Sequence, residues 1–494
     1  MFSQDMKFFS LILFVASHVS ITTTFAFSQN NNNSTQNDNQ QQYFLIFRSP
    51  PSQELLKNLS SQYSNVGELI TFSENLHFLP GEFDNEFIET FKDYNESDEN
   101  SLNNKKNWII AENGIVRALD NVISDDYVTE NSNFQKFNHG IFENKKNNIC
   151  VQNSVQSWGL DRIDQRTPTL SKTYSYPESA GYGVDVYVID TGIDIDHPEF
   201  EGRASWGITT TKQNTDKDEN GHGTFVAGII GSKTYGVAKR VNLIAVKSLD
   251  DEGTGSVQSV LYGLQYVIQS HMAKGGKAKT VANLSLGSEY NRAVNLAVSE
   301  LVKHGIIITA AAGNGYEGKG IDACNVSPAS ARTAITVGST TPTDYISRFS
   351  NYGECVNLFA PGQGILSSYP SPLNGSSIKS GTSFACPYVA GVVSLILSEL
   401  KPQQMSLLSI KSSNARPISI LNLLEKLATK NVISGLDGTL SPNMLVYNQV
   451  QELTSFESAG NLFIVKDFWS WLLTFCVLHL IFLQVLKLGY QQIF

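Results

Sequence analysis

From about residue 150 onward, short apolar runs alternate with longer amphipathic stretches, and no other feature of the chain constrains its fold as strongly. The apolar runs are short and rich in β-branched residues, so they predict strands that are covered on both faces. Strands that alternate with helices build a mostly parallel sheet between two helical layers. We therefore expect a three-layer α/β domain over residues 146–450, with its site at the carboxyl ends of the strands. The predicted strands span residues 184–189, 241–246, 281–286 and 306–310, and the predicted helices span 256–272 and 293–303.

A smaller unit precedes this domain and extends from residue 43 to residue 145. Strand-like runs such as YFLIF interleave there with helix-like stretches such as DNEFIETFKD, which predicts a small α+β domain. Before it, an apolar run behind Lys7 is typical of a secretory signal peptide over residues 1–26. Residues 27–42 are rich in Asn and Gln, and we expect them to be disordered.

The C-terminal end contains an apolar segment, residues 468–486, that follows a polar linker over residues 451–467. The segment is long enough to span a bilayer and opens with aromatic residues, so it predicts a transmembrane helix. A glycolipid-anchor signal near residues 458–460 and a docked amphipathic helix are the alternatives. The signal peptide and the predicted transmembrane helix together place the protein in the secretory pathway, with the vacuole, the cell surface or the outside of the cell as its destination. The helix also makes the membrane an expected partner.

Composition excludes one class of partner and suggests one covalent link. The net charge is -10 and there is no long basic stripe, so nucleic acid is not expected as a partner. The five cysteines match no zinc-binding spacing. Cys324 and Cys355 lie in polar, loop-like stretches and are the best candidates for a disulfide in an oxidising compartment.

Three motifs along the chain contain an aspartate, a histidine and a serine in settings that suit nucleophilic catalysis. Asp190 ends a buried strand in YVIDTG, His222 begins a helix in NGHGT, and Ser383 begins a helix in SGTSFA. A serine hydroxyl is a poor nucleophile until an adjacent base accepts its proton. A histidine can be that base, and a carboxylate can hold it in the correct tautomer. The motifs predict a hydrolase that forms an acyl-enzyme intermediate.

Further residues suit the stabilisation and binding of an extended peptide. Asn314 follows a strand in ITAAAGN, and its amide could donate to an oxyanion. Two segments end in small residues at a strand edge, where a peptide could pair as an added strand. The expected substrate-binding residues are Gly253, Thr254, Gly255, Ser285, Leu286 and Gly287.

These motifs resemble those of the subtilisin-like serine proteases (subtilases), and within them the proteinase K branch with its fungal vacuolar proteinase B, or cerevisin-like, enzymes. The resemblance covers about residues 150–450 and extends more weakly to residues 43–140. It implies a serine endopeptidase that needs no cofactor for its chemistry and acts on peptides or proteins. It also implies a self-processed zymogen, in which a ferredoxin-like propeptide inhibits the enzyme and is removed between about His139 and Gln156.

Several positions depart from the family pattern. Phe384 stands where methionine is usual, while Tyr388 and Phe225 replace histidines. These changes should alter the packing beside Ser383 without removing a catalytic group. Asn357 replaces a calcium-binding aspartate, so no firm calcium or other metal site is expected.

Two other functions fit parts of the sequence. A catalytically silent cell-surface or wall-associated protein could retain this scaffold, and the altered residues around Ser383 leave room for it. A kexin-like processing enzyme would need a further β-rich domain, for which residues 449–468 have no space.

Expected glycosylation sites are Asn58, Asn95 and Asn374, whereas Asn283 is discounted because it lies in a predicted buried strand.

Overall fold

The structure is a computed structural model that describes residues 42–63, 65–92, 108–120, 144–146, 148–213, 215–370, 375–400 and 416–448. All of these residues belong to one structural unit that begins at Gln41. The predicted signal peptide, residues 27–41 of the Asn/Gln-rich tract, the linker and the C-terminal apolar segment lie outside the described residues, whereas Gln42, the last residue of that tract, begins the first strand instead of being disordered.

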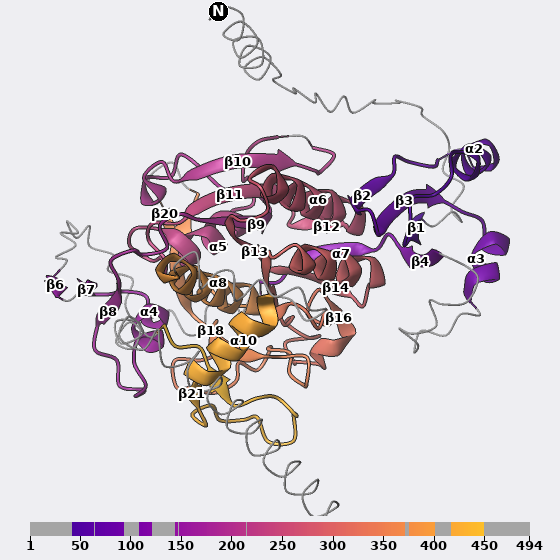
Figure 1. Ribbon diagram of the computed structural model, residues 1–494. Helices are drawn as coiled ribbons and strands as arrows, with labels where there is room; N and C mark the ends of the chain where they lie inside the picture. The colour runs from indigo at the N-terminus through magenta and orange to yellow at the C-terminus, as the bar shows by residue number, and fades with distance from the viewer. Residues whose placement is uncertain are drawn as a thin grey trace, which may run out of the picture. The chain divides into compact units, whose positions relative to one another are not determined.

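A nine-stranded sheet organises the larger domain (Figure 1). Neighbouring strands are parallel throughout, except for the pair of short strands at one edge. This arrangement confirms the predicted mostly parallel sheet. In spatial order the strands are β10 (Ala204–Thr209), β11 (Asn242–Lys247), β9 (Val184–Asp190), β13 (Lys279–Leu284), β15 (Ile307–Ala311), β17 (Ile335–Thr340), β18 (Leu358–Pro361), β22 (Met444–Leu445) and β21 (Thr429–Lys430).

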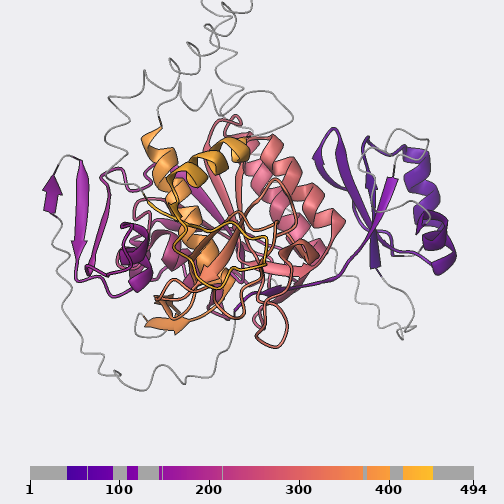
Figure 2. The same cartoon turned by 90° about the horizontal axis from the view of Figure 1, so that it is seen from below.

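Helices cover both faces of this sheet, because its central strands are apolar on both sides. In β9, Val186 and Val188 pack into one core cluster, whereas Tyr187 and Ile189 pack into another. Figure 2 shows α8 on one side of the sheet and the pair α6 and α7 on the other. The predicted three-layer fold is therefore correct. The covering helices are α5 (His222–Gly231), α6 (Val257–Ala273), α7 (Arg292–Lys303), α8 (Thr382–Glu399) and α10 (Arg416–Leu427).

The smaller domain has the order strand, helix, strand, strand, helix, strand, and its antiparallel sheet runs β2-β3-β1-β4. This is the ferredoxin-like arrangement that the resemblance implied. Along β1, Leu45 and Phe47 pack with the two helices of this domain, whereas Phe44 and Ile46 pack with apolar residues of α6 and α7. The elements are β1 (Gln42–Phe47), α2 (Gln53–Gln62), β2 (Ile70–Ser73), β3 (Leu76–Glu82), α3 (Asn85–Lys92) and β4 (Trp108–Glu112).

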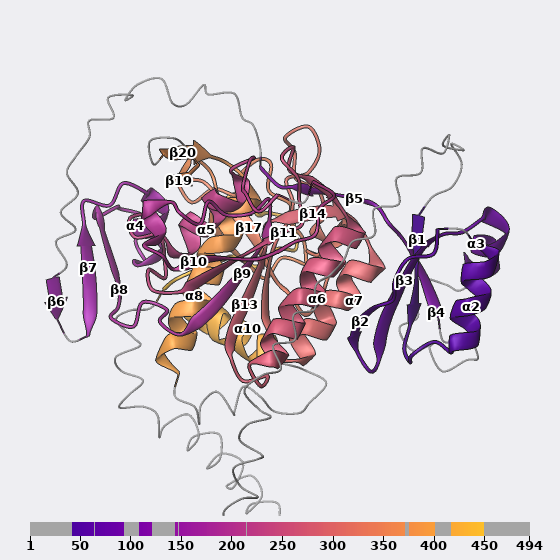
Figure 3. The ribbon, with the colours of Figure 1, turned by 90° about the horizontal axis from the view of Figure 1, so that it is seen from above.

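One strand leaves the smaller domain and joins the larger one. Strand β5 (Ile115–Ala118) lies between β12 (Thr254–Ser256) and β14 (Leu286–Glu289), and it is antiparallel to both (Figure 3). The alternation of strand and helix gave no sign of this insertion. The remaining elements are β6 (Asn144–Lys146), β7 (Ile149–Asn153), β8 (Thr173–Pro177), α4 (Trp158–Ile163), β16 (Val326–Ser327), β19 (Ile365–Tyr369), β20 (Gly375–Lys379) and the short 3-10 helices η2 (Pro198–Phe200) and η3 (Ala323–Asn325).

The predicted elements of the larger domain agree with the structure to within one or two residues, with one exception. The run 281–286 was expected to be a single strand, but β13 ends at Leu284 and β14 begins at Leu286. The intervening Ser285 uses its carbonyl and its hydroxyl to contact Ser383, so it belongs to neither ladder. The chain changes sheets at this residue.

Among the described residues, α8 is the helix with the length and apolarity that a bilayer would require. Its apolar window is 89% buried inside the domain. Helix α8 thus forms part of the core, and the predicted transmembrane segment at 468–486 lies outside the described residues.

Candidate active site

The carboxyl edge of the nine-stranded sheet brings the three predicted catalytic side chains together. Asp190 is the last residue of β9, His222 is the first residue of α5, and Ser383 is the second residue of α8. All three are fully buried in the structure. Their separation in sequence is bridged because parallel strands end at the same edge of a sheet.

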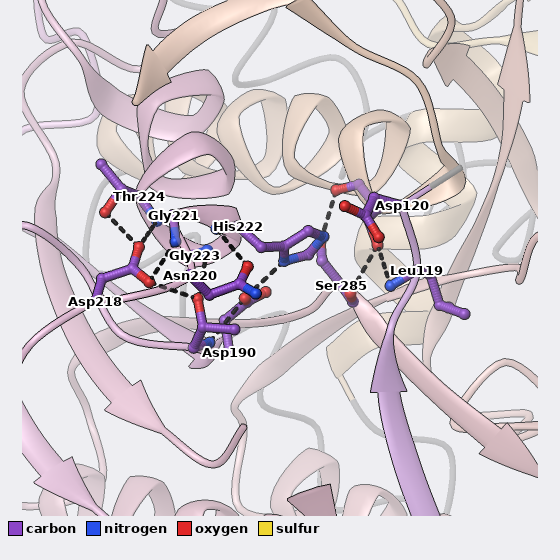
Figure 4. Close-up of polar contacts among 12 residues, drawn as sticks. Leu119, Asp120, Asp190, Asp218, Asn220, Gly221, His222, Gly223, Thr224 and Ser285 are labelled. Atoms are coloured by element: carbon purple, nitrogen blue, oxygen red, sulfur yellow. Dashed lines mark hydrogen bonds and ion pairs between the residues drawn. The ribbon is translucent and has the colours of Figure 1, made fainter. Parts of the chain in front are cut away.

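Asp190 and His222 form a short, buried polar pair (Figure 4). The Oδ1 atom of Asp190 lies 2.6 Å from Nδ1 of His222, and it also accepts a hydrogen bond from the backbone N–H of Thr191 at 2.8 Å. Burial by itself lowers the pKa of His222, but the charge and hydrogen bond of Asp190 outweigh it and raise that pKa. The contact leaves Nε2 of His222 as the nitrogen available for proton transfer.

A second carboxylate, Asp218, holds the first turn of α5 and was not predicted from the sequence. Its two oxygens accept hydrogen bonds from the N–H groups of Gly221 and Thr224, each at 2.8 Å, and from the hydroxyls of Thr191 and Thr224 (Figure 4). A carboxylate here satisfies free N–H groups at the helix N-terminus. The recognisable signal is an aspartate a few residues before the histidine, with Thr224 following it in the same turn.

The hydroxyl of Ser383 does not point at the base. It donates to the carbonyl oxygen of Ser285 at 2.7 Å and accepts from the N–H of Leu119 at 3.0 Å. The Nε2 atom of His222 forms no hydrogen bond with any residue in the described part of the chain. The Ser383 hydroxyl and Nε2 of His222 are therefore not hydrogen-bonded to each other in this structure.

Asn314 directs its amide at a carbonyl oxygen that comes from the smaller domain's strand. Its Nδ2 atom donates to the carbonyl oxygen of Leu119 at 2.6 Å, and the N–H of Ser383 reaches the same oxygen at 3.4 Å. The other end of the amide is held by Thr382, whose N–H and hydroxyl donate to Oδ1 at 2.9 and 2.8 Å. Two donors that converge on one carbonyl oxygen form the geometry of an oxyanion hole.

The six residues predicted to bind substrate lie along both sides of β5. Arg117 pairs with Thr254 on one side and with Gly287 on the other. The ladder continues toward Leu119, whose N–H lies 3.4 Å from the carbonyl oxygen of Ser285. The predicted set comprises Gly253, Thr254 and Gly255 on one edge, and Ser285, Leu286 and Gly287 on the other.

Two of the departures from the family pattern pack against each other, and the third contacts Ser157. The rings of Phe384 and Phe225 lie 4.6 Å apart between centroids, and Phe384 also lies 5.4 Å from the His222 ring. The hydroxyl of Tyr388 lies 3.0 Å from Oγ of Ser157. The substitutions thus fill the space behind the site instead of leaving a void.

The absence of a side chain at Gly159 makes the third departure possible. A Cβ atom at this position would lie 2.1 Å from the hydroxyl oxygen of Tyr388. Gly159 and Tyr388 are therefore matched in the structure.

Cys324 and Cys355 form the predicted disulfide, with an S–S distance of 2.08 Å. Cys150 and Cys386 are buried, and burial raises the pKa of the Cys386 thiol to about 12. Cys476 lies outside the described residues.

Asn357 stands at the position where the family pattern has a calcium-binding aspartate. The Oδ1 atom of Asn357 accepts a hydrogen bond from the N–H of Thr336 at 2.7 Å, so the amide contacts the sheet. The residues Asp250, Asp251 and Glu252 place carboxylate oxygens close together, but two of the three are exposed.

Of the expected glycosylation sites, Asn58 is exposed on α2, whereas Asn95 and Asn374 lie outside the described residues. Asn283 is fully buried, and its amide contacts Ser285, Thr309 and Cys386.

A three-layer domain with these groups at the carboxyl edge of its sheet has the architecture of a serine peptidase. Residues 181–436 match the subtilase family. The subtilisin-like serine protease Rho m 2.0101 of Rhodotorula mucilaginosa is 42% identical over 306 residues, which cover 60% of this chain and 88% of that protein. Cerevisin of Saccharomyces cerevisiae is 42% identical over 317 residues, which cover 62% of this chain and 49% of cerevisin.

A crystal structure of a cold adapted subtilisin-like serine proteinase shares this fold, with a TM-score of 0.50 and 41% identity. The match covers 59% of this chain and 97% of that chain. The chain therefore belongs to the subtilase family and is a serine endopeptidase. Hydrolysis by this family needs no cofactor.

Proposed function

We propose that this endopeptidase works through Ser383, His222 and Asp190, with Asn314 as a donor to the oxyanion. The Oγ atom of Ser383 attacks the substrate carbonyl carbon and transfers its proton to Nε2 of His222. The negative charge moves to the carbonyl oxygen, where Asn314 Nδ2 and the N–H of Ser383 donate hydrogen bonds. His222 then protonates the leaving amine, and water hydrolyses the acyl-enzyme ester by the reverse proton path.

One rotation is needed before this sequence can begin. The Ser383 hydroxyl must turn about its Cα–Cβ bond from the carbonyl of Ser285 toward Nε2 of His222. Rotation between staggered side-chain positions is fast compared with enzyme turnover. In the structure, the Ser383 hydroxyl therefore has the orientation that precedes the reaction.

We infer that the chain is made as a self-inhibited precursor. The observation that carries this proposal is the carbonyl oxygen of Leu119, which receives hydrogen bonds from both oxyanion donors. Strand β5 pairs with both edges of the cleft at the same time. A segment bound in this way excludes other peptides, because it uses the backbone groups that a substrate strand would need.

The interface between the two domains supports the same conclusion. Apolar residues of the small sheet, including Phe72 and Phe78, share a core cluster with α6 and α7. The side chain of Asn291 also donates to the carbonyl of Glu112 at 2.8 Å. The small domain is thereby held in place while its strand occupies the cleft.

The test uses the full chain with Ser383→Ala. Peptide hydrolysis and self-cleavage should both be lost, with kcat falling about 10⁶-fold, the size known for subtilisin. A fluorophosphonate probe should label the wild-type enzyme at Ser383 and leave the variant unlabelled.

Ser394→Ala is the matched control, because Ser394 is buried in the same helix and bonds only to the Ala390 carbonyl. Activity in purified Ser383→Ala protein would contradict the assignment. A wild-type chain that stays uncut and unlabelled would instead favour the catalytically silent alternative, in keeping with the contact between Ser383 and Ser285.

The cellular location of the enzyme is also a proposal. The signal peptide predicted at 1–26 and the disulfide between Cys324 and Cys355 together support a route through the secretory pathway. Attachment to a membrane through residues 468–486 and glycosylation at Asn58, Asn95 and Asn374 belong to the same proposal.

A further inference from the structure

We infer that the peptide bond between Leu119 and Asp120 is the first bond that this enzyme cleaves in its own chain, and that Lys379 recognises the acidic residue on its leaving side. The inference rests on the proposed endopeptidase function and goes beyond it by naming the bond and the subsites. It also differs from the region between His139 and Gln156 that the family resemblance implied.

The acyl side of this bond is seated as a substrate would be. The carbonyl oxygen of Leu119 lies 2.6 Å from Asn314 Nδ2, and its N–H lies 3.0 Å from the Ser383 hydroxyl. Gly381 permits this approach, because a Cβ atom at that position would lie 2.5 Å from the Leu119 oxygen. The site therefore closes around one particular carbonyl.

The side chain of Leu119 packs directly against Gly287. A Cβ atom built on Gly287 would lie 3.0 Å from Cδ1 of Leu119 and 3.2 Å from Cγ1 of Val326. A glycine at this wall leaves room for a branched apolar side chain. Leu119 is partly buried against the apolar core of the larger domain, so a charged residue in its place would lose contact with water without gaining a partner.

On the leaving side, the carboxylate of Asp120 meets a positioned cation. Its Oδ2 atom lies 3.4 Å from Nζ of Lys379, and both side chains are partly buried. Lys379 ends β20, and its Nζ lies 5.3 Å from the centre of the Tyr369 ring. Tyr369 is itself anchored, because its hydroxyl donates to the carbonyl of Asn220 at 2.9 Å. Lys379 is thus held where the first residue of a leaving group lies.

The proposed step balances within the chain and one water molecule. Ser383 Oγ forms an ester with the carbonyl carbon of Leu119 and passes its proton to His222. The bond from that carbon to the Asp120 nitrogen breaks, and His222 returns the proton to this nitrogen. Water then cleaves the ester, which leaves a carboxylate on Leu119 and an amine on Asp120.

The primary experiment reads the cleaved bond directly. The full-length chain is purified as a precursor, allowed to process itself, quenched at intervals and analysed by intact mass and terminal sequencing. Asn314→Ala is run in parallel, because loss of such a donor lowers the rate about 10²–10³-fold in subtilisin-type enzymes, which leaves time to sample the first cleavage. We expect a released fragment that ends at Leu119 and a partner that begins at Asp120.

A first fragment that ends between residues 139 and 156, with the bond at 119–120 intact, would overturn the inference and leave the proposed function standing. Failure of the proposed function looks different, because the chain would then remain uncut and would not react with the fluorophosphonate probe. Leu119→Glu should slow self-cleavage at least tenfold. Ile141→Glu, which places the same charge in the region implied by the resemblance, should process at the wild-type rate.

The role of Lys379 is tested on the processed enzyme with two peptides that differ only in Asp or Asn after the cleaved leucine. A partly exposed ion pair supports a two- to fivefold preference in kcat/KM for the Asp peptide. Lys379→Met should bring this ratio to about one when both peptides are measured on the same variant at the same pH. An unchanged ratio would overturn the assignment of Lys379.

Discussion

At the scale of single residues, the site depends on a few charges whose balance sets the protonation of His222. Burial and the Lys379 charge lower the pKa of His222, whereas Asp190 and Asp120 raise it, and the net shift is upward. Asp120 belongs to the segment in the cleft, so the charge around the base differs between the precursor and an enzyme that has released this segment. The pH dependence of self-cleavage should therefore respond to both Asp120 and Lys379.

The change to test is Asp120→Asn in the full-length precursor. Because His222 must be neutral to accept the proton of Ser383, a raised pKa places the acidic limb of the rate profile at higher pH. Removal of the Asp120 charge should move that limb to lower pH, as measured by the rate of precursor loss between pH 4 and 9.

Lys379→Met provides a control of opposite sign. It removes a charge that lowers the pKa of His222, so the acidic limb should move to higher pH. Shifts in the same direction for both variants would show that neither charge acts through His222.

At the scale of elements, the position of His222 depends on how the first turn of α5 is anchored. Asp218 accepts four hydrogen bonds there from groups that would otherwise be buried without partners. Each unsatisfied buried donor costs about 1–3 kcal/mol. The anchor acts through His222 and has no contact with the peptide bond to be cleaved.

Asp218→Ala should lower the free energy of unfolding by about 2–4 kcal/mol, measured by urea unfolding in a Ser383→Ala background that prevents self-digestion. In the active background it should lower kcat more than it changes KM, because the base is displaced while the cleft edges remain. Asp218→Asn, which keeps one acceptor oxygen, should recover part of both losses.

Asp216→Ala is the matched control, since Asp216 lies on the same loop and accepts one exposed hydrogen bond from Thr209. Its effect on stability should stay within about 0.5 kcal/mol. An equal loss in both variants would indicate a general effect of the loop, with no special part for Asp218.

At the scale of the whole molecule, a partly buried carboxylate makes stability depend on pH. Asp164 follows α4, and its Oδ2 accepts a hydrogen bond from the N–H of Ser175 in β8 at 2.7 Å. Burial, with a smaller contribution from the nearby Asp161 charge, raises the pKa of Asp164 to about 7. The folded state therefore holds this proton more tightly than the unfolded state, where the pKa is about 3.9.

The stability supplied by protonated Asp164 is complete below about pH 4 and is lost as the pH rises toward 7. Asp164→Asn stays neutral throughout, so its advantage over the parent should grow across this range to about 2–4 kcal/mol at pH 8. Urea unfolding at several pH values, again with Ser383→Ala, measures this difference. The exposed Asp437→Asn is the control, and its curve should run parallel to that of the parent.

Local pattern predicted most of the architecture, because each element carries its own period and its own boundary residues. The apolar runs at 184–189 and 306–310 and the helix at 293–303 were located within a residue or two. The exception was Ser285, where the chain leaves one sheet for another although the apolar run continues. Periodicity does not reveal which sheet a strand joins, since that choice depends on residues far away in the chain.

The sequence by itself determined the fold class and brought Asp190, His222, Ser383 and Asn314 forward as candidates, because each stands at a strand end or helix start within a recognisable motif. Only the tertiary structure decided what occupies the cleft. Leu119 and Asp120 carry no local signal, and their contacts with Asn314 and Lys379 join residues about two hundred or more positions apart. Such contacts form only when the two domains pack together. For this physical reason the sequence pointed to cleavage between residues 139 and 156, whereas the structure leads us to propose the bond after Leu119.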